Sequence, residues 1–304
     1  MRETQTTGKK RPVTGSTLSS ATAEQPIGFV DSGVGGLPYL QRARELLPEE
    51  RFVYLADRQH FPYGVRTRDE IHAVVIGAVS ELVRAAQPKM VVVACNTASV
   101  VSLSELRTTF SIPFVGVVPA IKPAGAAVKE GRIGVLATER TVEDPYVSSL
   151  VREFAPDSGL VLAAAGQLVE IIETRLTVAS REEILAALRV PVEELNAESV
   201  DAVVLGCTHF VHVRGELSRM LGDKIPVLDS LEGVARQIVR VCEHIGRAGR
   251  APHGVPGREE RDLLLVSGGK PLEDSGEAAD ENYRRLAAKF NLELLDHQPV
   301  DQDR

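Results

Sequence analysis

The chain has 304 residues, 43% of them hydrophobic, which is enough for one large domain or two moderate ones with buried cores. Its formal net charge is −7 and no clustered Lys/Arg face is evident, which argues against nucleic acid as a partner. No apolar stretch is long enough to span a bilayer, so we expect no membrane partner. At the start of the chain, residues 1–25 are polar and lack the apolar core of a secretory signal, which favours a disordered extension.

Short apolar runs rich in β-branched residues alternate with helical patterns along the rest of the chain. Strands that are apolar throughout are buried on both faces, so this alternation predicts an α/β protein with mostly parallel sheets flanked by helices. The predicted strands are 27–30, 52–55, 91–93, 114–117, 133–136, 160–163, 203–205, 227–228 and 263–266. The first predicted helices are 37–47, 68–86 and 98–108.

A weak internal repeat divides the chain into two similar lobes. The run that starts at Ile27 resembles the run that starts at Ile133, an offset of 106 residues. The segment around Cys95 resembles the segment around Cys207, an offset of 112 residues. We therefore expect a first lobe over 26–117 plus 227–304 and a second over 118–226. The two cysteines then face each other across the cleft between the lobes, a usual place for a ligand.

The chain contains three cysteines, Cys95, Cys207 and Cys242. An odd number, wide spacing and the missing signal argue against a disulfide framework and favour a cytoplasmic protein with reduced thiols. Cys242 lies on a predicted helix face and reads as a small buried hydrophobic residue.

A glycine-rich loop, residues 31–36, follows the first predicted strand and precedes a helix. Its glycines allow close backbone approach, and the helix N-terminus offers N–H groups to an anion. A dinucleotide fingerprint would need a third glycine where Pro38 stands. The loop therefore suits a small carboxylate better than a pyrophosphate.

The other two cysteines each follow a predicted strand, where parallel α/β sheets bind ligands. Nucleophilic catalysis could use Cys207 with His209 but would leave Cys95 unused. Zinc could be bound by Cys95, Cys207 and His209 together, yet their spacing is not that of a compact metal site. Redox chemistry usually uses a CxxC pair, which is absent here. A pair of acid/base thiols accounts for both cysteines: one removes a proton from carbon and the other delivers one from the opposite face.

Four motifs occur in order: 31–36, 54–57 with 62–64, 94–99, and 206–210. Together they resemble the motif set of the glutamate racemases of the aspartate/glutamate racemase family, over about residues 26–295. The resemblance implies an isomerase that interconverts L- and D-glutamate by a two-thiol mechanism and supplies D-glutamate for peptidoglycan synthesis. It implies no cofactor and no metal, with glutamate as substrate and a homodimer as assembly.

The resemblance also implies roles for individual residues. Cys95 and Cys207 would be the catalytic bases, with Asp31 assisting Cys95, His209 assisting Cys207, and Glu170 as a further acidic residue on the Cys207 side. The residues that would hold the substrate are Asp31, Ser32, Tyr63, Gly64, Asn96, Thr97, Thr208 and His209.

Some positions depart from the family pattern, all in the second lobe. Val211 stands where a proline is usual, Arg140 where a glycine is usual, and the run from Asp144 lacks the usual serine. The Cys-Pro element that often precedes Glu170 is also absent. Both catalytic cysteines remain, so these departures bear on the second lobe's cleft wall.

Alternatives remain on the sequence alone. The substrate could be aspartate or another amino acid, and a non-catalytic two-lobed amino-acid-binding protein or a metal-dependent hydrolase would fit the same segments. In some family members an N-terminal extension accompanies activation by a cell-wall precursor nucleotide, which makes residues 1–25 a candidate for the same role.

Overall fold

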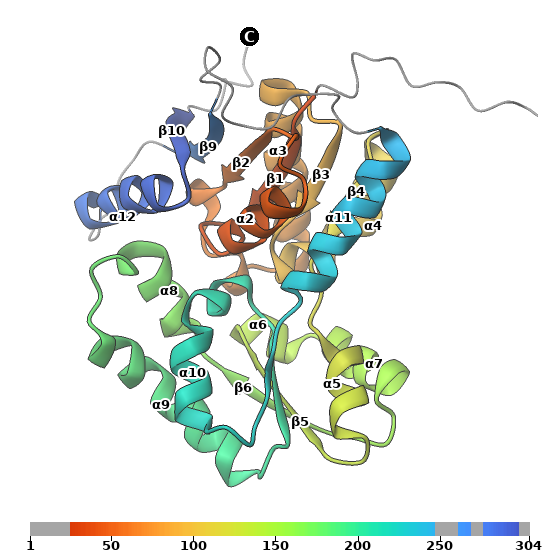
Figure 1. The fold of residues 1–304 in the computed structure, drawn as a ribbon, viewed down its shortest axis with the longest axis vertical. Coiled ribbons are helices and arrows are strands. Elements are labelled where there is room, and N and C mark those ends of the chain that lie inside the picture. Colours follow the sequence, from red (N-terminus) through yellow and green to blue (C-terminus); the bar gives the residue numbers. More distant parts are fainter. Residues whose placement is uncertain (1–24, 247–260, 269–275, 298–304) are drawn as a thin grey trace, which may run out of the picture.

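The computed structural model describes residues 25–246, 261–268 and 276–297. They form two parallel sheets that lie in two lobes, one above the other in Figure 1. The six-stranded sheet has the order β10-β9-β2-β1-β3-β4 and the four-stranded sheet the order β6-β5-β7-β8. The predicted α/β class is confirmed, whereas the predicted disorder of the N-terminal extension falls, except for Gln25, outside the described residues.

The predicted strands are confirmed within one or two residues of their ends. The first sheet contains β1 (Ile27–Asp31), β2 (Phe52–Ala56), β3 (Met90–Val93), β4 (Phe114–Gly116), β9 (Asp262–Ser267) and β10 (Leu292–His297). The second sheet contains β5 (Arg132–Ala137), β6 (Gly159–Ala164), β7 (Ala202–Leu205) and β8 (Val227–Leu228). The edge strand β10, which pairs with β9, was not predicted.

Helices cover both sheets, and two of them begin at a capping box. Thr67 forms a capping box with Glu70, and Ser180 forms one with Glu183. Around the first sheet lie α2 (Leu37–Leu46), α3 (Arg68–Ala86), α4 (Asn96–Thr109), α11 (Leu231–Ile245), α12 (Gly276–Lys289) and the 3-10 turns η1 (Arg58–His60) and η2 (Tyr63–Val65). Around the second lie α5 (Ile121–Val128), α6 (Glu139–Glu143), α7 (Pro145–Phe154), α8 (Gly166–Arg175), α9 (Arg181–Ala197), α10 (Arg214–Leu221) and the 3-10 helix η3 (Thr208–Val213).

The two sheets repeat one strand order, which is the structural counterpart of the predicted internal repeat. The run β2-β1-β3-β4 in the first sheet corresponds to β6-β5-β7-β8 in the second. Cys95 comes two residues after β3, and Cys207 comes two residues after the equivalent strand β7. The fold thus brings each cysteine to the carboxyl end of its sheet, where ligands bind in such folds.

The position of β8 corrects the predicted lobe boundary. Val227 and Leu228 pair with Val203 and Val204 of β7, so these two residues belong to the second sheet. The first lobe therefore resumes after Leu228, not at residue 227. From there α11 packs against α2 of the first lobe.

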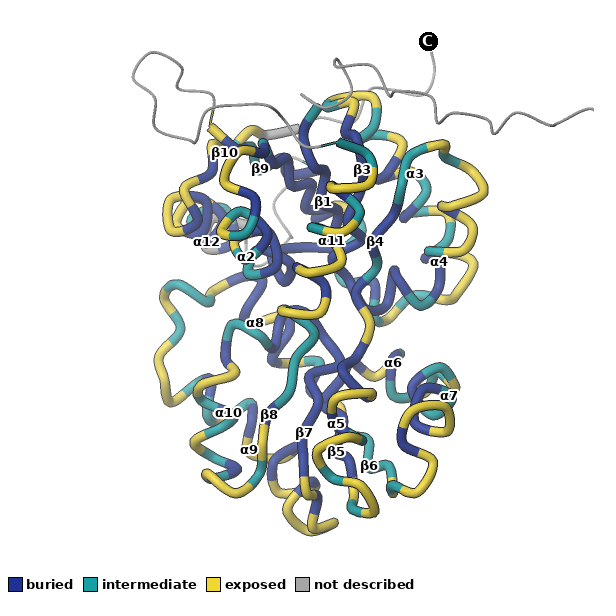
Figure 2. The backbone as a smooth tube through the Cα atoms, turned by 45° about the vertical axis from the view of Figure 1, so that its right-hand side comes forward, coloured by how far each residue is buried: buried dark blue, intermediate teal, exposed yellow. Residues whose placement is uncertain are grey.

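Burial follows the layers of the fold, with dark strands inside and exposed helix faces outside in Figure 2. Every residue of β1, β2 and β3 is buried, as expected for strands covered on both faces. One apolar cluster continues from Leu37 and Leu40 of the first lobe to Leu168 and Ile172 of the second, so the lobes share packed surface.

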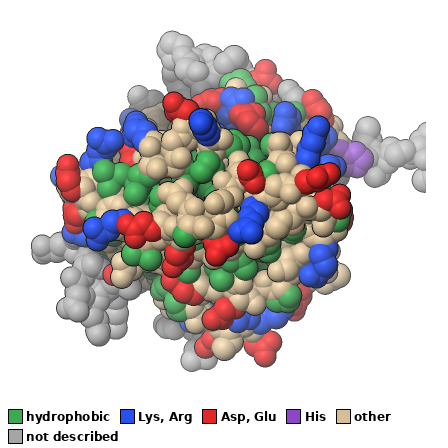
Figure 3. Space-filling model, turned by 90° about the horizontal axis from the view of Figure 1, so that it is seen from below, with side chains coloured by type: hydrophobic (Ala, Val, Ile, Leu, Met, Phe, Trp, Pro, Cys, Tyr) green, Lys and Arg blue, Asp and Glu red, His purple; other side chains and the backbone are tan. Residues whose placement is uncertain are grey.

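The surface carries both signs of charge, and Lys/Arg and Asp/Glu side chains alternate on the face drawn in Figure 3. Within the described ranges, no helix is both long enough and apolar enough to cross a bilayer.

Candidate active site

The glycine-rich loop folds around the carboxylate of Asp31 at the end of β1. This carboxylate accepts hydrogen bonds from the N–H groups of Ser32 (2.7 Å) and Gly36 (2.8 Å) and from the Tyr54 hydroxyl (3.2 Å). Burial raises the pKa of Asp31 to about 6, with a further contribution from the charge of Glu173 and with the His209 charge and the two N–H groups opposing. Asp31 can therefore gain or lose a proton near neutral pH.

Cys95 is buried at the residue before α4 begins. Burial and the nearby charge of Asp31 hold the pKa of Cys95 well above its ordinary value, although the Ala98 N–H opposes the shift and the Cys207 charge adds to it. This environment favours the neutral thiol at Cys95.

Asn96, the first residue of α4, has a buried side chain. Within the described part of the chain, neither its Nδ2 nor its Oδ1 has a hydrogen-bond partner. Buried amides are normally satisfied, so this side chain is available to a polar ligand beside Cys95.

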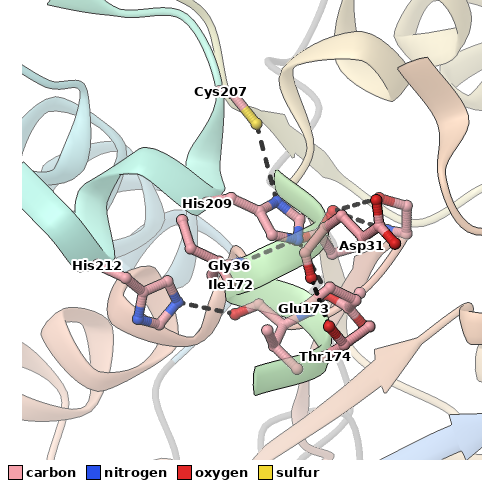
Figure 4. A network of polar contacts seen from close by, with 12 residues as sticks. Asp31, Gly36, Ile172, Glu173, Thr174, Cys207, His209 and His212 are labelled. Carbon is pink, nitrogen blue, oxygen red and sulfur yellow. Dashed lines mark hydrogen bonds and ion pairs between the residues drawn. The ribbon is translucent and has the colours of Figure 1, made fainter. Parts of the chain in front are cut away.

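On the opposite lobe, Cys207 starts a buried chain of contacts (Figure 4). Its Sγ lies 3.7 Å from His209 Nδ1, and His209 Nε2 lies 3.0 Å from Glu173 Oε2. Burial lowers the pKa of His209, but the hydrogen bonds and charges of Cys207 and Glu173 outweigh it, so the pKa lies well above its ordinary value. The imidazolium form is favoured, and its Nδ1–H can donate to a thiolate at Cys207.

Glu173 is the residue that joins this chain of contacts to the first lobe. Its Oε2 also accepts from the N–H of Val34 (2.9 Å), and its Oε1 accepts from the Tyr283 hydroxyl. Val34 is held by the second lobe a second time, because its carbonyl accepts from Nε2 of His212 at 3.1 Å. Burial lowers the pKa of His212 to about 3, so this histidine acts as a neutral donor.

A second acidic residue, which was not predicted, lies beside Cys207. The predicted Glu170 is exposed on α8 and lines the adjoining pocket, whereas Glu173, one helical turn further on, is buried and contacts His209. The sequence did contain a signal for Glu173. It follows the buried Val169 at a spacing of four residues, which puts a carboxylate on the apolar face of the helix.

Two glycines of the loop fit against this part of the second lobe. A Cβ atom on Gly33 would lie 2.0 Å from Glu173 Oε2, and one on Gly35 would lie 2.4 Å from His209 Nδ1. The close backbone approach predicted for this loop therefore exists, and its partners are Glu173 and His209 of the opposite lobe.

Several residues expected to hold the substrate already have protein partners. The Tyr63 hydroxyl donates to Asp57 (2.7 Å), which also accepts from Ser267 (2.7 Å). Thr97 Oγ1 lies 3.4 Å from Thr141 Oγ1, a contact between the lobes. The Tyr63 hydroxyl therefore stabilises the turn through Asp57.

A pocket of about 480 Å³ opens beside these residues. Phe61 lies in its wall, and the Phe61 ring centre is 6.1 Å from that of His209, so the pocket adjoins the Cys207 side. Both lobes line it, through Phe61, Pro62, Gly64, Val65, Thr138, Glu139, Gly166, Gln167, Val169, Glu170 and Thr174. Ser32 and Thr208 are buried and directly follow Asp31 and Cys207 in the sequence. In the described ranges, no three His, Cys, Asp or Glu side chains are grouped to hold a metal ion.

Taken together, the geometry defines a class of protein in which two similar α/β lobes each deliver a buried thiol to their common interface. Each thiol has its own titratable neighbour, Asp31 for Cys95 and His209 for Cys207. The neighbours differ in charge, so the two thiols are alike in position and unlike in environment.

Known proteins agree with this class. The Asp/Glu/hydantoin racemase model matches residues 39–238. Glutamate racemase of Deinococcus radiodurans is 41% identical over 223 residues, which cover 73% of this chain and 76% of that protein. Glutamate racemase of Brucella anthropi is 36% identical over 280 residues, 91% of this chain and 96% of that protein. Escherichia coli glutamate racemase, solved in complex with L-glutamate and activator UDP-MurNAc-ala, superposes with a TM-score of 0.77 at 32% identity, covering 91% of this chain and 98% of that chain.

The chain belongs to the Asp/Glu/hydantoin racemase family. The family resemblance and the two-sheet fold expected from the sequence are thereby confirmed.

Proposed function

We propose that this protein is a glutamate racemase that interconverts L- and D-glutamate without a cofactor. The observation that carries the proposal is the pair of buried thiols, Cys95 and Cys207, at equivalent strand ends of facing lobes. The glutamate racemases that resemble this chain over most of its length support the choice of glutamate as substrate.

In one direction Cys207 acts as the base. The imidazolium of His209 stabilises the Cys207 thiolate, which removes the α-proton of the bound amino acid. Negative charge then moves onto the substrate carboxylate. The neutral thiol of Cys95 delivers a proton to the opposite face, and the configuration at the α-carbon is inverted.

In the other direction the two thiols exchange roles. Cys95 must first lose its proton to Asp31, whose pKa is raised to about 6 chiefly by burial. Cys207 must gain a proton, which the His209 imidazolium supplies from Nδ1. The Cys207 thiol then donates to the substrate and returns to the thiolate beside His209. Each direction leaves the two thiols in the protonation states that the opposite direction requires.

Neutral donors at helix starts stabilise the charge that develops on the substrate carboxylate. The free amide of Asn96 and the hydroxyls of Ser32, Thr97 and Thr208 are buried around the two cysteines and suit this task. A buried site strengthens such hydrogen bonds because water does not compete for them.

The product D-glutamate would serve peptidoglycan synthesis in the cytoplasm, with the protein as a homodimer. The Escherichia coli relative was solved with an activator, UDP-MurNAc-ala. We propose that residues 1–25 of this chain carry a comparable response to a cell-wall precursor nucleotide. Their deletion should then abolish activation by such a nucleotide and leave the basal rate unchanged.

Circular dichroism of L- and D-glutamate, with aspartate and other amino acids in parallel, tests the activity and its substrate. Racemisation of glutamate and incorporation of solvent deuterium at its α-carbon are expected. Faster turnover of aspartate than of glutamate would identify aspartate as the substrate. Binding of glutamate without exchange of its α-proton would indicate a non-catalytic binding protein.

A further inference from the structure

The carboxylate of Glu173 is held mainly by the lobe to which it does not belong. Of its three hydrogen-bond donors, His209 lies in the second lobe, whereas the Val34 N–H and the Tyr283 hydroxyl come from the first. Tyr283 lies on α12, near the C-terminal end of the chain, and α12 packs against α8 in Figure 1.

The neighbouring residue fixes α12 onto the end of α8. Asn282 Nδ2 donates to the carbonyls of Ile172 (3.2 Å) and Glu173 (2.8 Å), and its Oδ1 accepts from the N–H of Thr177 (3.0 Å). Asn282 is buried, so these bonds form without competition from water. Tyr283 therefore approaches Glu173 from a fixed position.

The first lobe holds Tyr283 from its other side. The Arg58 guanidinium lies 5.5 Å from the centre of the Tyr283 ring and forms an ion pair with Asp280 one turn earlier on α12. Burial and the adjacent Glu173 charge raise the pKa of Tyr283 well above its ordinary value, so the phenol stays protonated and remains a donor. Separation of the lobes at this edge must break the contact between Tyr283 and Glu173.

We infer that Tyr283 is a positioning residue that holds Glu173 against His209 in the closed arrangement of the lobes, and so supports proton transfer at Cys207. The inference rests on the proposed racemase function. It assigns to α12 a role in only one of the two proton transfers, because no described contact links Tyr283 to Cys95 or joins its hydroxyl to Asp31.

The test is Tyr283→Phe, which removes only the hydroxyl. Loss of one hydrogen bond to a carboxylate should lower kcat/KM about tenfold. Because the two enantiomers are equally stable, kcat/KM must fall equally in both directions. The informative measurement is therefore the isotope effect on kcat/KM with α-deuterated D- and L-glutamate.

A slower transfer at Cys207 should change the two isotope effects in opposite directions. The effect should rise for the enantiomer that Cys207 deprotonates, since that step becomes more rate-limiting. It should fall towards unity for the other enantiomer, whose deuterium is removed at Cys95. A purely structural loss would slow both transfers and leave the ratio of the two effects unchanged, which would overturn the inference.

Tyr39→Phe is the matched control. Tyr39 is also buried in the first lobe, and its hydroxyl contacts Ser230 (2.9 Å) and has no described contact with Glu173. This variant should keep the wild-type rate and both isotope effects.

A second variant keeps the inference testable if Tyr283→Phe folds poorly. In a Glu173→Gln background, the Asn282→Ala change should cost less than twofold in kcat/KM, whereas in the wild type it should cost several-fold. Asn282 fixes the position of Tyr283, which acts on catalysis only through the Glu173 carboxylate. Equal losses in both backgrounds would refute the inference. If wild-type protein exchanged no α-proton of glutamate, the proposed function itself would fail, which is a distinct result.

Discussion

A methyl group at Gly33 should displace the carboxylate of Glu173 in the opposite lobe. The Cβ atom of Gly33→Ala would lie 2.0 Å from Glu173 Oε2, whereas ordinary contact begins at 3.4 Å, so one side must move by about 1.4 Å. The clashing group is the end of a flexible side chain, so Glu173 moves more readily than the backbone. A shift of this size stretches the 3.0 Å contact with His209 Nε2 beyond hydrogen-bond length.

The magnitude follows from the bonds that Oε2 makes. Both the His209 contact and the Val34 N–H contact converge on this atom, and hydrogen bonds to charged groups contribute about 1.5–3 kcal/mol each. Loss of about 3 kcal/mol in the transition state lowers kcat/KM roughly a hundredfold. The free energy of unfolding should fall by only about 1–3 kcal/mol, since Glu173 keeps part of its bonding.

Racemisation followed by circular dichroism, together with urea unfolding, measures both effects. Gly77→Ala is the control: no atom outside α3's own neighbouring backbone lies within 4 Å of the added Cβ, and replacing a glycine inside a helix stabilises by about 0.5–1 kcal/mol. Gly77→Ala should keep full activity. Near-wild-type activity in Gly33→Ala would show that Glu173 need not contact His209 during catalysis and would refute the reasoning.

The remaining predictions concern the other site residues. Cys95→Ala and Cys207→Ala should each abolish racemisation of both enantiomers, measured by circular dichroism, and near-full turnover of either variant would exclude the two-thiol mechanism. Glu173→Gln should lose about a hundredfold in kcat/KM, whereas Glu170→Gln, at an exposed position, should stay within twofold. A larger loss in Glu170→Gln than in Glu173→Gln would show that Glu170 is the acidic residue that supports the Cys207 side. Asp31 has a pKa raised from 3.8 to about 6, chiefly by burial, so its contribution to stability is present below pH 3.8 and lost as the pH rises through 6. Urea unfolding should therefore find Asp31→Asn gaining about 3 kcal/mol relative to wild type between pH 3.5 and 7, and a pH-independent difference would contradict the shift.

The positions of most strands along the chain could be predicted because buried parallel strands have a distinctive composition, apolar throughout and rich in β-branched residues. The edge strand β10 could not be predicted, because Leu292–His297 (LELLDH) mixes leucines with acidic residues and lacks the β-branched residues that mark the other strands; it pairs only with β9. The sheet to which β8 belongs could not be predicted from the sequence either. Two apolar residues, Val227 and Leu228, pair equally well with any parallel neighbour, and only the tertiary fold selects β7.

The site divides in the same way. Cys95 and Cys207 were found because the repeat places them at equivalent strand ends, a property that the sequence encodes locally. Glu173 was missed because motif position favoured Glu170, although the spacing from Val169 marked a carboxylate on a buried helix face. Tyr283 lies 110 residues from Glu173 in the sequence, and nothing local indicates that their side chains meet.

The asymmetry of the two thiols has a structural origin in how the lobes complete each other. Asp31, the neighbour of Cys95, is bonded wholly within the first lobe, through Ser32, Gly36 and Tyr54. Glu173, which supports the Cys207 side, takes two of its three donors from the opposite lobe. Lobe separation would therefore leave Asp31's hydrogen bonds intact and dismantle those of Glu173. It follows that closure over the substrate governs proton transfer at Cys207 more strongly than at Cys95.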